Sequence, residues 1–137
     1  MRELLEVVSK SRAEIVAHFY VPAIFGHWPA DEVLLDYEDR LLDVCAQQGS
    51  AVELNARFLY KDHPEEQKAR YLAVHERLLK KAVAKNVGIA VASDAHSPVD
   101  QGRAFERVVP LLDRAGVTEL VFPVGGKLTA VPRVSVR

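Results

Sequence analysis

The sequence has few of the features that mark secreted, membrane-bound or nucleic-acid-binding proteins. Its one cysteine, Cys45, excludes an internal disulfide and a zinc cluster built from several thiolates. No apolar run approaches the roughly 20 residues that a membrane-spanning helix needs, and the first residues lack the apolar stretch of a signal peptide. The 18 basic and 19 acidic residues nearly balance, which gives no field to attract a nucleic acid or an anionic membrane. We therefore expect a cytoplasmic protein with neither kind of partner.

What the sequence does contain is a regular alternation of predicted strands and helices within one domain of 137 residues. Short apolar runs predict strands at residues 15–17, 51–55, 87–92 and 117–122. Apolar residues that recur every three to four positions predict helices at residues 4–11, 31–48, 64–85 and 105–115. Asp31 is placed to cap the second helix, Gly49 to end it, and Pro64 to begin the third.

The order of these elements predicts the fold class. Alternating strands and helices imply a parallel sheet, because each crossover returns the chain to the same end of the sheet. The predicted fold class is therefore α/β, with the order β-α-β-α-β-α-β after a leading amphipathic helix. The tail at residues 124–137 has no helical period, and we expect it to be irregular. The pattern leaves open whether the sheet is open or part of a barrel.

Polar residues lie at the C-terminal ends of the first three predicted strands: His18, Glu53, Asn55, Asp94 and His96. In parallel α/β folds these ends share one rim, where binding and catalytic sites form. Asp94 and His96 are two residues apart, so both side chains point the same way from an extended backbone. A carboxylate with imidazoles is a ligand set for zinc, manganese or iron. The pattern therefore predicts a metal site at this rim.

Each of these residues also has an ordinary structural interpretation. His18 alone would be a hydrogen-bonded loop residue. Asp94, between two serines, could cap the helix that follows it. Glu53 could pair with a buried arginine. Their common position at one rim, rather than any single residue, favours a site.

Three segments carry a family resemblance: Ile15-Val16-Ala17-His18 with Phe25-Gly26 after it, Val52-Glu53-Leu54-Asn55, and Ser93-Asp94-Ala95-His96-Ser97-Pro98. The first resembles the histidine-ended strand and loop of histidinol phosphatases, and the second is similar to their next strand. The third resembles the signature near the C-terminus of the PHP (polymerase and histidinol phosphatase) family. The resemblance covers nearly the whole chain, and three ordered segments are more specific than any one of them.

This resemblance implies the C-terminal part of a distorted (β/α)7 TIM-like barrel, and residues 1–137 would form a single partial PHP domain. It implies His18, Asp94 and His96 as metal ligands, with Asp94 and His96 as the catalytic residues. The substrate side would hold three further residues: Glu53, Asn55 and Arg57. The substrate would be a phosphorylated small molecule, and the cofactor a divalent zinc, manganese or iron ion that activates water and neutralises phosphoryl oxygens.

Two features depart from the family pattern. Tyr20 stands where histidinol phosphatases usually have an aspartate, two residues after the first histidine. No histidine precedes His18, whereas the family begins with a His-x-His segment and has further ligands on earlier strands. The other histidines, His27, His63 and His75, are not placed to replace them. We therefore expect an incompletely coordinated metal, and either a homo-oligomer or a missing N-terminal half.

Two functions stay open. The first is a histidinol-phosphatase-like phosphoric monoester hydrolase, truncated and with reduced or no activity alone. The alternative is a non-catalytic oligomerisation or binding module derived from the same fold. In the first, Arg57 and Lys61 would contact phosphate; both can also be read as solvated loop charges. An unrelated small-molecule-binding α/β domain would need a glycine-rich loop after the first strand, and residues 19–30 hold one glycine.

Overall fold

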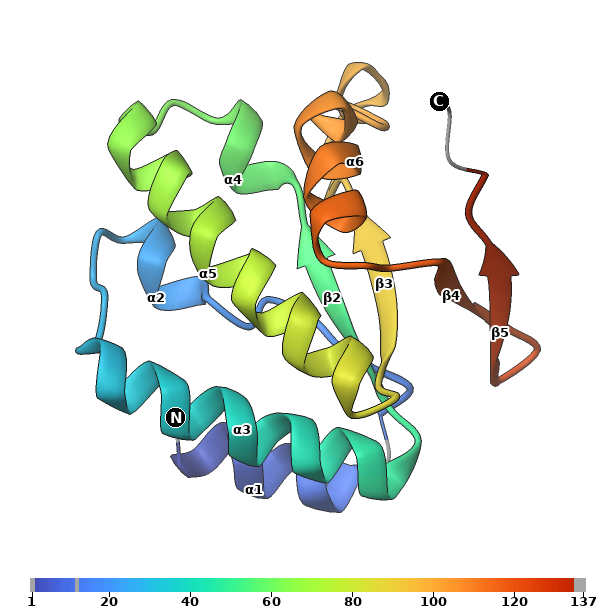
Figure 1. Ribbon diagram of the computed structural model, residues 1–137. Helices are drawn as coiled ribbons and strands as arrows, with labels where there is room; N and C mark the ends of the chain where they lie inside the picture. The colour runs from blue at the N-terminus through green and yellow to red at the C-terminus, as the bar shows by residue number, and fades with distance from the viewer. Residues whose placement is uncertain (1, 12, 135–137) are drawn as a thin grey trace.

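The computed structural model describes residues 2–11 and 13–134 and has a mixed α/β fold (Figure 1). Three strands form one parallel sheet in the order β1-β2-β3: β1 Ile15–Val16, β2 Ala51–Asn55 and β3 Gly88–Ala92. Val16 pairs with Val52, and Asn55 pairs with Ala92, so the C-terminal ends of the strands lie along one edge. The prediction of a parallel sheet in an α/β fold is confirmed for these three strands.

Two long helices return the chain between these strands and lie on the same side of the sheet (Figure 1). α3, Asp31–Gln48, connects β1 to β2, and α5, Glu65–Ala84, connects β2 to β3. The leading helix α1, Arg2–Ser11, lies against α3. Gly49 ends α3 in the predicted left-handed conformation, with φ of 72°. Two helix starts differ by one position: Ala30 caps α3 in place of Asp31, and Pro64 is itself the N-cap of α5.

The core lies between the sheet and these helices, because successive residues of a strand face opposite sides. On β2, Val52 and Leu54 are buried with the leucines of α3 and α5. The other face of the sheet carries small residues. Ala51 and Ala90 pack there with Val121 in a second, smaller cluster. The helix-covered face of the sheet therefore holds most of the hydrophobic core, and the other face holds a smaller cluster of small residues.

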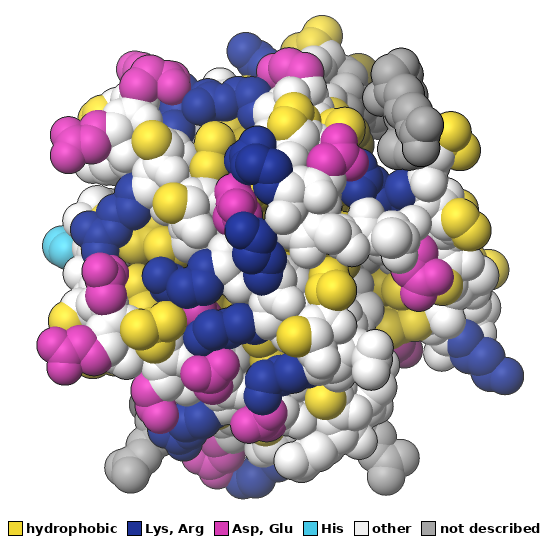
Figure 2. All heavy atoms as spheres, viewed as in Figure 1, with side chains coloured by type: hydrophobic (Ala, Val, Ile, Leu, Met, Phe, Trp, Pro, Cys, Tyr) yellow, Lys and Arg dark blue, Asp and Glu magenta, His cyan; other side chains and the backbone are white. Residues whose placement is uncertain are grey.

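Basic and acidic side chains are interspersed over the helices on the face seen in Figure 2. Several form ion pairs between elements: Arg77 lies 2.5 Å from Glu38, and Lys81 lies 3.0 Å from Asp39, which joins α5 to α3. This mixture of signs is typical of a solvent-facing helix surface. Among the helices of the described residues, none has the length and apolarity that a bilayer crossing requires.

The last part of the chain differs from the prediction. After β3 the chain forms α6, Phe105–Arg114, and then a hairpin. Its strands, β4 Glu119–Val124 and β5 Lys127–Pro132, pair antiparallel in a separate two-stranded sheet. The prediction of a fourth parallel strand is therefore wrong, and so is the prediction of an irregular tail up to residue 132; residues 135–137 lie outside the described residues. The strands described here form no closed barrel.

A glycine pair explains the hairpin. Gly125 and Gly126 have φ of 59° and 75°, as the favoured two-residue hairpin turn requires. The chain therefore turns back, and β4 pairs with β5 in a separate sheet instead of joining the parallel sheet beside β3. The hairpin still packs on the sheet through Val121. A Cβ built on Gly88 would lie 3.2 Å from the Val121 side chain, so the missing side chain at Gly88 permits this close approach.

Short helical turns follow the ends of the three parallel strands. They are α2 Val21–Ile24, α4 Arg57–Tyr60 and the 3-10 turn η1 Pro98–Asp100. The sequence did not predict them, because segments of three or four residues are too short to show a helical period. They shape the loops at the C-terminal rim of the sheet, where the predicted site residues lie.

Candidate functional site

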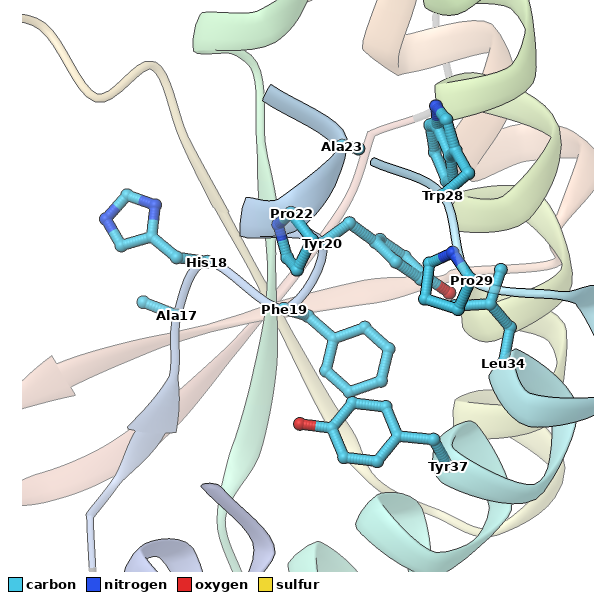
Figure 3. Close-up of a pocket in the computed structure, with 10 residues that line it drawn as sticks. All are labelled: Ala17, His18, Phe19, Tyr20, Pro22, Ala23, Trp28, Pro29, Leu34 and Tyr37. Carbon is cyan, nitrogen blue, oxygen red and sulfur yellow. The ribbon is translucent and has the colours of Figure 1, made fainter. Parts of the chain in front are cut away.

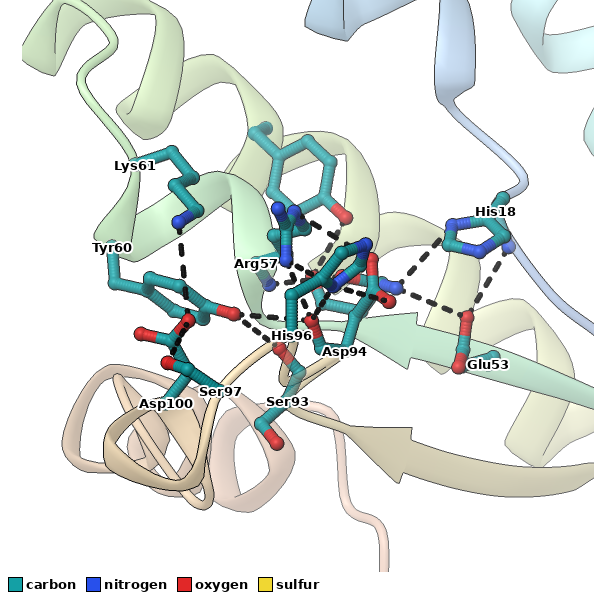
Figure 4. A network of polar contacts seen from close by, with 12 residues as sticks. His18, Glu53, Arg57, Tyr60, Lys61, Ser93, Asp94, His96, Ser97 and Asp100 are labelled. Atoms are coloured by element: carbon teal, nitrogen blue, oxygen red, sulfur yellow. Dashed lines mark hydrogen bonds and ion pairs between the residues drawn. The ribbon is translucent and has the colours of Figure 1, made fainter.

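The predicted site residues follow the C-terminal ends of β1, β2 and β3 and lie in one connected group (Figure 4). A small cavity of about 20 Å³ is lined from all three strand ends, by His18, Tyr20, Asn55, Arg57, Phe58, Tyr71 and Asp94. Glu53 joins the group through a hydrogen bond to His18, and His96 through contacts with Arg57 and Asp94. Two residues far apart in the sequence, His18 and Asp94, therefore line the same cavity.

Two of the predicted metal ligands have a left-handed backbone. φ is 57° at His18 and 50° at Asp94, a region that residues other than glycine seldom adopt. Such conformations cost on the order of 1–3 kcal/mol each, and they cluster at functional sites. Surrounding contacts hold both of them. The His18 backbone N–H donates to Glu53 Oε2 at 3.2 Å, and the Asp94 carbonyl accepts a 2.8 Å hydrogen bond from Arg57.

Asn55 connects the ends of β1 and β2. It is buried, and its Oδ1 accepts a 2.9 Å hydrogen bond from the backbone N–H of Arg57. Since this donor requires an oxygen, the bond assigns the two ends of the amide. The amide nitrogen then lies 3.3 Å from His18 Nδ1 and 3.5 Å from Glu53 Oε2. Because Nδ1 accepts from this N–H, neutral His18 carries its proton on Nε2.

Arg57 connects the ends of β2 and β3. Its Nη1 donates to the Asp94 carbonyl oxygen at 2.8 Å and also contacts Nδ1 of His96. Its Nε lies 3.9 Å from Asp94 Oδ2, and both side chains are only about a quarter exposed, at 27% and 25%. The guanidinium charge is therefore directed at the carboxylate and the imidazole that the sequence predicts as metal ligands.

His96 makes its polar contacts through one ring nitrogen, Nδ1. Its Nδ1 lies 2.9 Å from the Asp94 carbonyl oxygen and 3.7 Å from Asp94 Oδ1. The same Nδ1 contacts the guanidinium of Arg57. A neutral ring nitrogen can donate to the carbonyl or accept from the guanidinium, but it cannot do both. The imidazole is 63% exposed, so the ring is open to a ligand.

A second ion-pair group supports the loop that follows Asp94. Asp100 is buried, and its carboxylate lies 3.9 Å from Lys61 Nζ and 3.2 Å from Arg103 Nη1. Burial by itself raises the pKa of Asp100, but the Arg103 hydrogen bond and the Lys61 charge lower this pKa overall. The Tyr60 hydroxyl donates to the Asp94 carbonyl at 3.2 Å. Lys61 is therefore paired with Asp100 and is less available to a phosphate than the sequence indicates.

The remaining histidines lie outside this group. His63 stacks on Phe58, with ring centroids 4.1 Å apart, and His27 is exposed. His75 is buried on α5 beside Tyr71, again with centroids 4.1 Å apart. Burial lowers the pKa of His75 to about 4. It is therefore a neutral core residue, held by a 2.9 Å hydrogen bond to the Tyr71 carbonyl.

Tyr20, which stands where the resemblance predicts an aspartate, has a structural role. Its hydroxyl donates a 2.7 Å hydrogen bond to Glu38, whose side chain is fully buried. Arg77 and Lys81 complete the pairing at 2.5 Å and 3.3 Å. Burial and the charge of Glu38 raise the pKa of Tyr20, so the hydroxyl remains a donor. Tyr20 thus links the rim cavity that it lines to the interface between α3 and α5.

A larger apolar cavity of about 280 Å³ lies beside the rim cavity and shares His18 and Tyr20 with it (Figure 3). Phe19 and Tyr37 stack in its wall, with ring centroids 4.9 Å apart. In Figure 3 the His18 imidazole points away from these rings. Trp28 also lines the cavity, and its buried Nε1 has no hydrogen-bond partner within the described part of the chain. The rim therefore has an apolar neighbour of the size of a small organic group.

No protein-family model matches the sequence, and no curated protein matches it. Two observations therefore bear on function: the geometry of the rim and the segments that carry the resemblance.

The residue types at the rim fit a divalent cation, since imidazoles and carboxylates are its usual protein ligands. Within residues 2–11 and 13–134, however, no three His, Cys, Asp or Glu side chains are grouped closely enough to hold one. The hydrogen bonds give a physical reason. Asn55 directs an N–H at His18, and Arg57 directs its guanidinium at Asp94 and His96. A cation at this rim would have to displace these donors.

Three supporting residues were not predicted from the sequence: Tyr60, Tyr71 and Asp100. Tyr71 donates a 2.8 Å hydrogen bond to the Asn55 carbonyl, although its spacing indicates only an apolar helix face. The sequence around Asp100 does contain a feature that could have predicted its role. It follows Ser97-Pro98, a sequence typical of a helical first turn, and the Ser97 hydroxyl donates to its carboxylate at 3.2 Å.

Proposed function

We propose that this chain is the C-terminal part of a PHP-family, metal-dependent phosphoester hydrolase that acts on a phosphorylated small molecule, as histidinol phosphatases do. The observation that carries the proposal is that His18 and Asp94 line one cavity at the strand ends, both with a left-handed backbone. Convergent, strained polar residues at the C-terminal ends of parallel strands are typical of active sites. The three segments that resemble the family support the proposed family, and the residues at the rim support the proposed chemistry.

In this proposal Asp94, His96 and His18 hold a divalent zinc, manganese or iron ion. The ion would lower the pKa of a water molecule and offset the charge of the phosphoryl oxygens. Asp94 and His96 lie on one loop, with His96 Nδ1 3.7 Å from Asp94 Oδ1, so they would be the first pair of ligands. His18 would join them after its Nδ1 receives the proton that Nε2 now carries.

The substrate phosphate is assigned to Arg57. Its planar guanidinium suits two phosphoryl oxygens at once, and it faces the cavity that His18 and Asp94 also line. Asn55 positions Arg57 through the bond to its backbone N–H. Glu53 positions His18 by accepting from its backbone N–H. The apolar cavity beyond His18 would receive the organic part of the substrate.

Three ligands leave coordination positions of the ion unfilled. We infer that groups outside the described residues supply the remainder, and that activity of this chain by itself is low. Weak metal affinity is therefore part of the proposal, and measurements need millimolar rather than micromolar metal as a starting range.

The test is hydrolysis of p-nitrophenyl phosphate with added Mn²⁺, Zn²⁺ or Fe²⁺, with and without a chelator. We expect hydrolysis that requires the metal and that is lost in Asp94→Asn and in His96→Gln. His27→Gln is the matched control, because His27 is exposed and lies outside the rim group. The number of metal ions bound per chain is measured in parallel, so metal binding is detected even if the chain hydrolyses no substrate. No metal bound at any concentration, or equal loss in the control, would contradict the proposal.

A non-catalytic oligomerisation module is the second candidate, and one feature favours it. The β4–β5 hairpin exposes apolar side chains, with Phe122 43% exposed, Val124 61% and Val131 47%. A hairpin with an apolar surface suits pairing with a second copy of the chain. This candidate predicts an oligomer in light scattering that persists in chelator and dissociates in Phe122→Ser. A monomer that binds metal would exclude it.

A further inference from the structure

We propose that the apolar cavity beside the rim binds a small uncharged molecule, one aromatic ring with a single hydrogen-bonding group, and that the Tyr37 hydroxyl pairs with that group. This binding requires neither a metal ion nor a phosphoryl group, so it goes beyond the proposed function. Only one further step, that the organic part of the substrate is a ring of this kind, rests on the proposed function.

The cavity has the size and the wall shape for one aromatic ring. Its volume is about 280 Å³, whereas an apolar cavity of about 150 Å³ is enough to hold benzene. The rings of Phe19 and Tyr37 are stacked with 13° between their planes, and Tyr20 meets Phe19 edge on at 4.6 Å. Pro22 and Pro29 also line the cavity (Figure 3). Flat walls of this kind pack closely against another flat ring.

The charge of the walls favours an uncharged ligand. Among the described residues that line the cavity there is no Asp, Glu, Lys or Arg. A charged ligand would therefore lose its hydration without gaining an ion pair. His18 belongs to both cavities, but in Figure 3 its imidazole points away from the aromatic rings.

Three other lining side chains carry a polar atom, and two of these atoms are not open to a ligand. The Tyr20 hydroxyl already donates to Glu38 at 2.7 Å. Nε1 of Trp28 is itself buried, so it does not reach the open space of the cavity. The third polar atom is the hydroxyl oxygen of Tyr37.

Tyr37 is only 5% exposed, and its hydroxyl makes no hydrogen bond with the described part of the chain. Burial alone raises the pKa of Tyr37 to about 12, with no contribution from a hydrogen bond or a neighbouring charge. A neutral phenol hydroxyl can both donate and accept, and a buried one without a partner loses free energy that a ligand can restore. In Figure 3 this hydroxyl points toward the side of the cavity where Ala17 and His18 lie.

Water is a poor partner for this hydroxyl. A well-held water molecule in a cavity needs roughly two to four polar partners, and the described side chains of the walls offer it Tyr37 alone. A ligand that replaces such water keeps the hydrogen bond and adds apolar contact with the rings. A phenol or a similar molecule combines these two properties.

The experiment is a titration with 4-methylphenol and with toluene, without metal or phosphate, followed by proton–nitrogen NMR. The chain has one tryptophan, so Trp28 gives a single indole N–H signal in the cavity wall. We expect 4-methylphenol to shift this signal with a dissociation constant on the order of 0.1–1 mM. It should bind roughly fivefold more tightly than toluene, because only 4-methylphenol pairs with the Tyr37 hydroxyl.

Three variants separate the hydroxyl from the cavity. Tyr37→Phe keeps the ring, so it should weaken 4-methylphenol binding roughly fivefold and leave toluene binding unchanged. Tyr60→Phe is the matched control, because the Tyr60 hydroxyl bonds to the Ser93 carbonyl outside this cavity. It should leave both affinities unchanged. Ala23→Leu puts a larger side chain into the wall and should bind neither probe, with its fold checked by the remaining N–H signals.

No binding of either probe, or equal affinity of 4-methylphenol for the unmodified chain and Tyr37→Phe, would overturn the inference. An oligomer that dissociates as 4-methylphenol is added would assign the cavity to a side chain of a second copy, which would overturn a small-molecule occupant. None of these results bears on metal binding at the rim. A chain that binds 4-methylphenol but no metal would support this inference and contradict the proposed function.

Discussion

The side-chain nitrogen of Asn55 lies 3.3 Å from Nδ1 of His18, and the side-chain oxygen of Asn55 is held by the backbone N–H of Arg57. This relationship gives a test of His18 as a ligand. In Asn55→Asp one oxygen still accepts from Arg57, while the other can accept from His18 Nδ1–H and so free Nε2. Partners of this kind change metal affinity by about 10–100-fold. We expect Asn55→Asp to tighten Mn²⁺ binding by roughly tenfold in calorimetry.

Added negative charge alone also attracts a cation, so the prediction needs a charge control. Asn86→Asp adds the same charge at a distant turn where Asn86 has φ of 55°, a conformation that aspartate tolerates. It should leave the affinity near that of the unmodified chain. If Asn55→Asp binds Mn²⁺ no more tightly than Asn86→Asp, His18 is not a ligand in the proposed sense.

Removal of the Tyr20 hydroxyl tests the structural role of this residue. Tyr20→Phe takes away a 2.7 Å hydrogen bond from the buried Glu38 carboxylate and leaves that charge with fewer donors. The expected loss in the free energy of unfolding is about 1–3 kcal/mol, measured by urea denaturation. Tyr37→Phe is the control, since it removes a tyrosine hydroxyl from the same aromatic group. Equal losses in the two variants would contradict a specific Tyr20–Glu38 contribution.

His75 makes stability depend on pH. Burial lowers the pKa of folded His75 to about 4, from 6.5 in its unperturbed state. As the pH falls below 6.5, the unfolded chain binds this proton before the folded chain does, so unfolding becomes easier. The free energy of unfolding should fall by about 1.4 kcal/mol per pH unit at most, and by about 3 kcal/mol in total as the pH reaches 4.

The check is a set of urea denaturation curves at several pH values for the unmodified chain and for His75→Phe. His75→Phe retains an aromatic ring beside Tyr71 and has no proton to bind. Its stability should be flatter with pH across this window, although its carboxylates still titrate at the acid end. Identical slopes in the two proteins would show that His75 is not buried in its neutral form.

Gly88 sets how closely the hairpin approaches the sheet. In Gly88→Ala the new methyl group would lie 3.2 Å from Val121 and 3.2 Å from the Ala51 Cβ, both closer than ordinary contact. We expect a loss of about 1–3 kcal/mol in the free energy of unfolding and faster amide exchange in β4 and β5. Val121→Ala makes room for the methyl group, so the double variant should lose less than the sum of the single losses. If the two losses were additive, the destabilisation in Gly88→Ala would not come from its contact with Val121.

The sequence predicted those helices and strands that are long enough to show a clear apolar pattern. α3 and α5 and the three parallel strands lie close to their predicted ranges, because each has a continuous apolar pattern. The hairpin was missed because residues 117–122 read equally well as a parallel or an antiparallel strand. The turn at Gly125 and Gly126, where both residues have a positive φ, decides between these two pairings. Pairing between strands depends on such turns and on packing partners such as Gly88 more than on apolar runs.

The sequence predicted the position of the site in the fold better than the contacts among its side chains. Strand ends and chain order suffice to bring His18, Asn55 and Asp94 to one cavity, because parallel strands end at one edge. The contacts among these side chains depend on their rotamers and on nearby hydrogen-bond donors. The spacing of residues in the sequence predicts neither. The clearest example is Arg57. The sequence indicates a phosphate contact, whereas the structure places its guanidinium on Asp94 and His96.

The most direct test of the account is the position of a bound metal. Crystals grown with Zn²⁺ and methylphosphonate, with diffraction recorded at the zinc absorption edge, locate the ion without reference to activity. We predict an anomalous peak within about 2.0–2.2 Å of Asp94 and His96 side-chain atoms. A peak at His27 or His63 alone, or no peak at the rim of the parallel sheet, would contradict it.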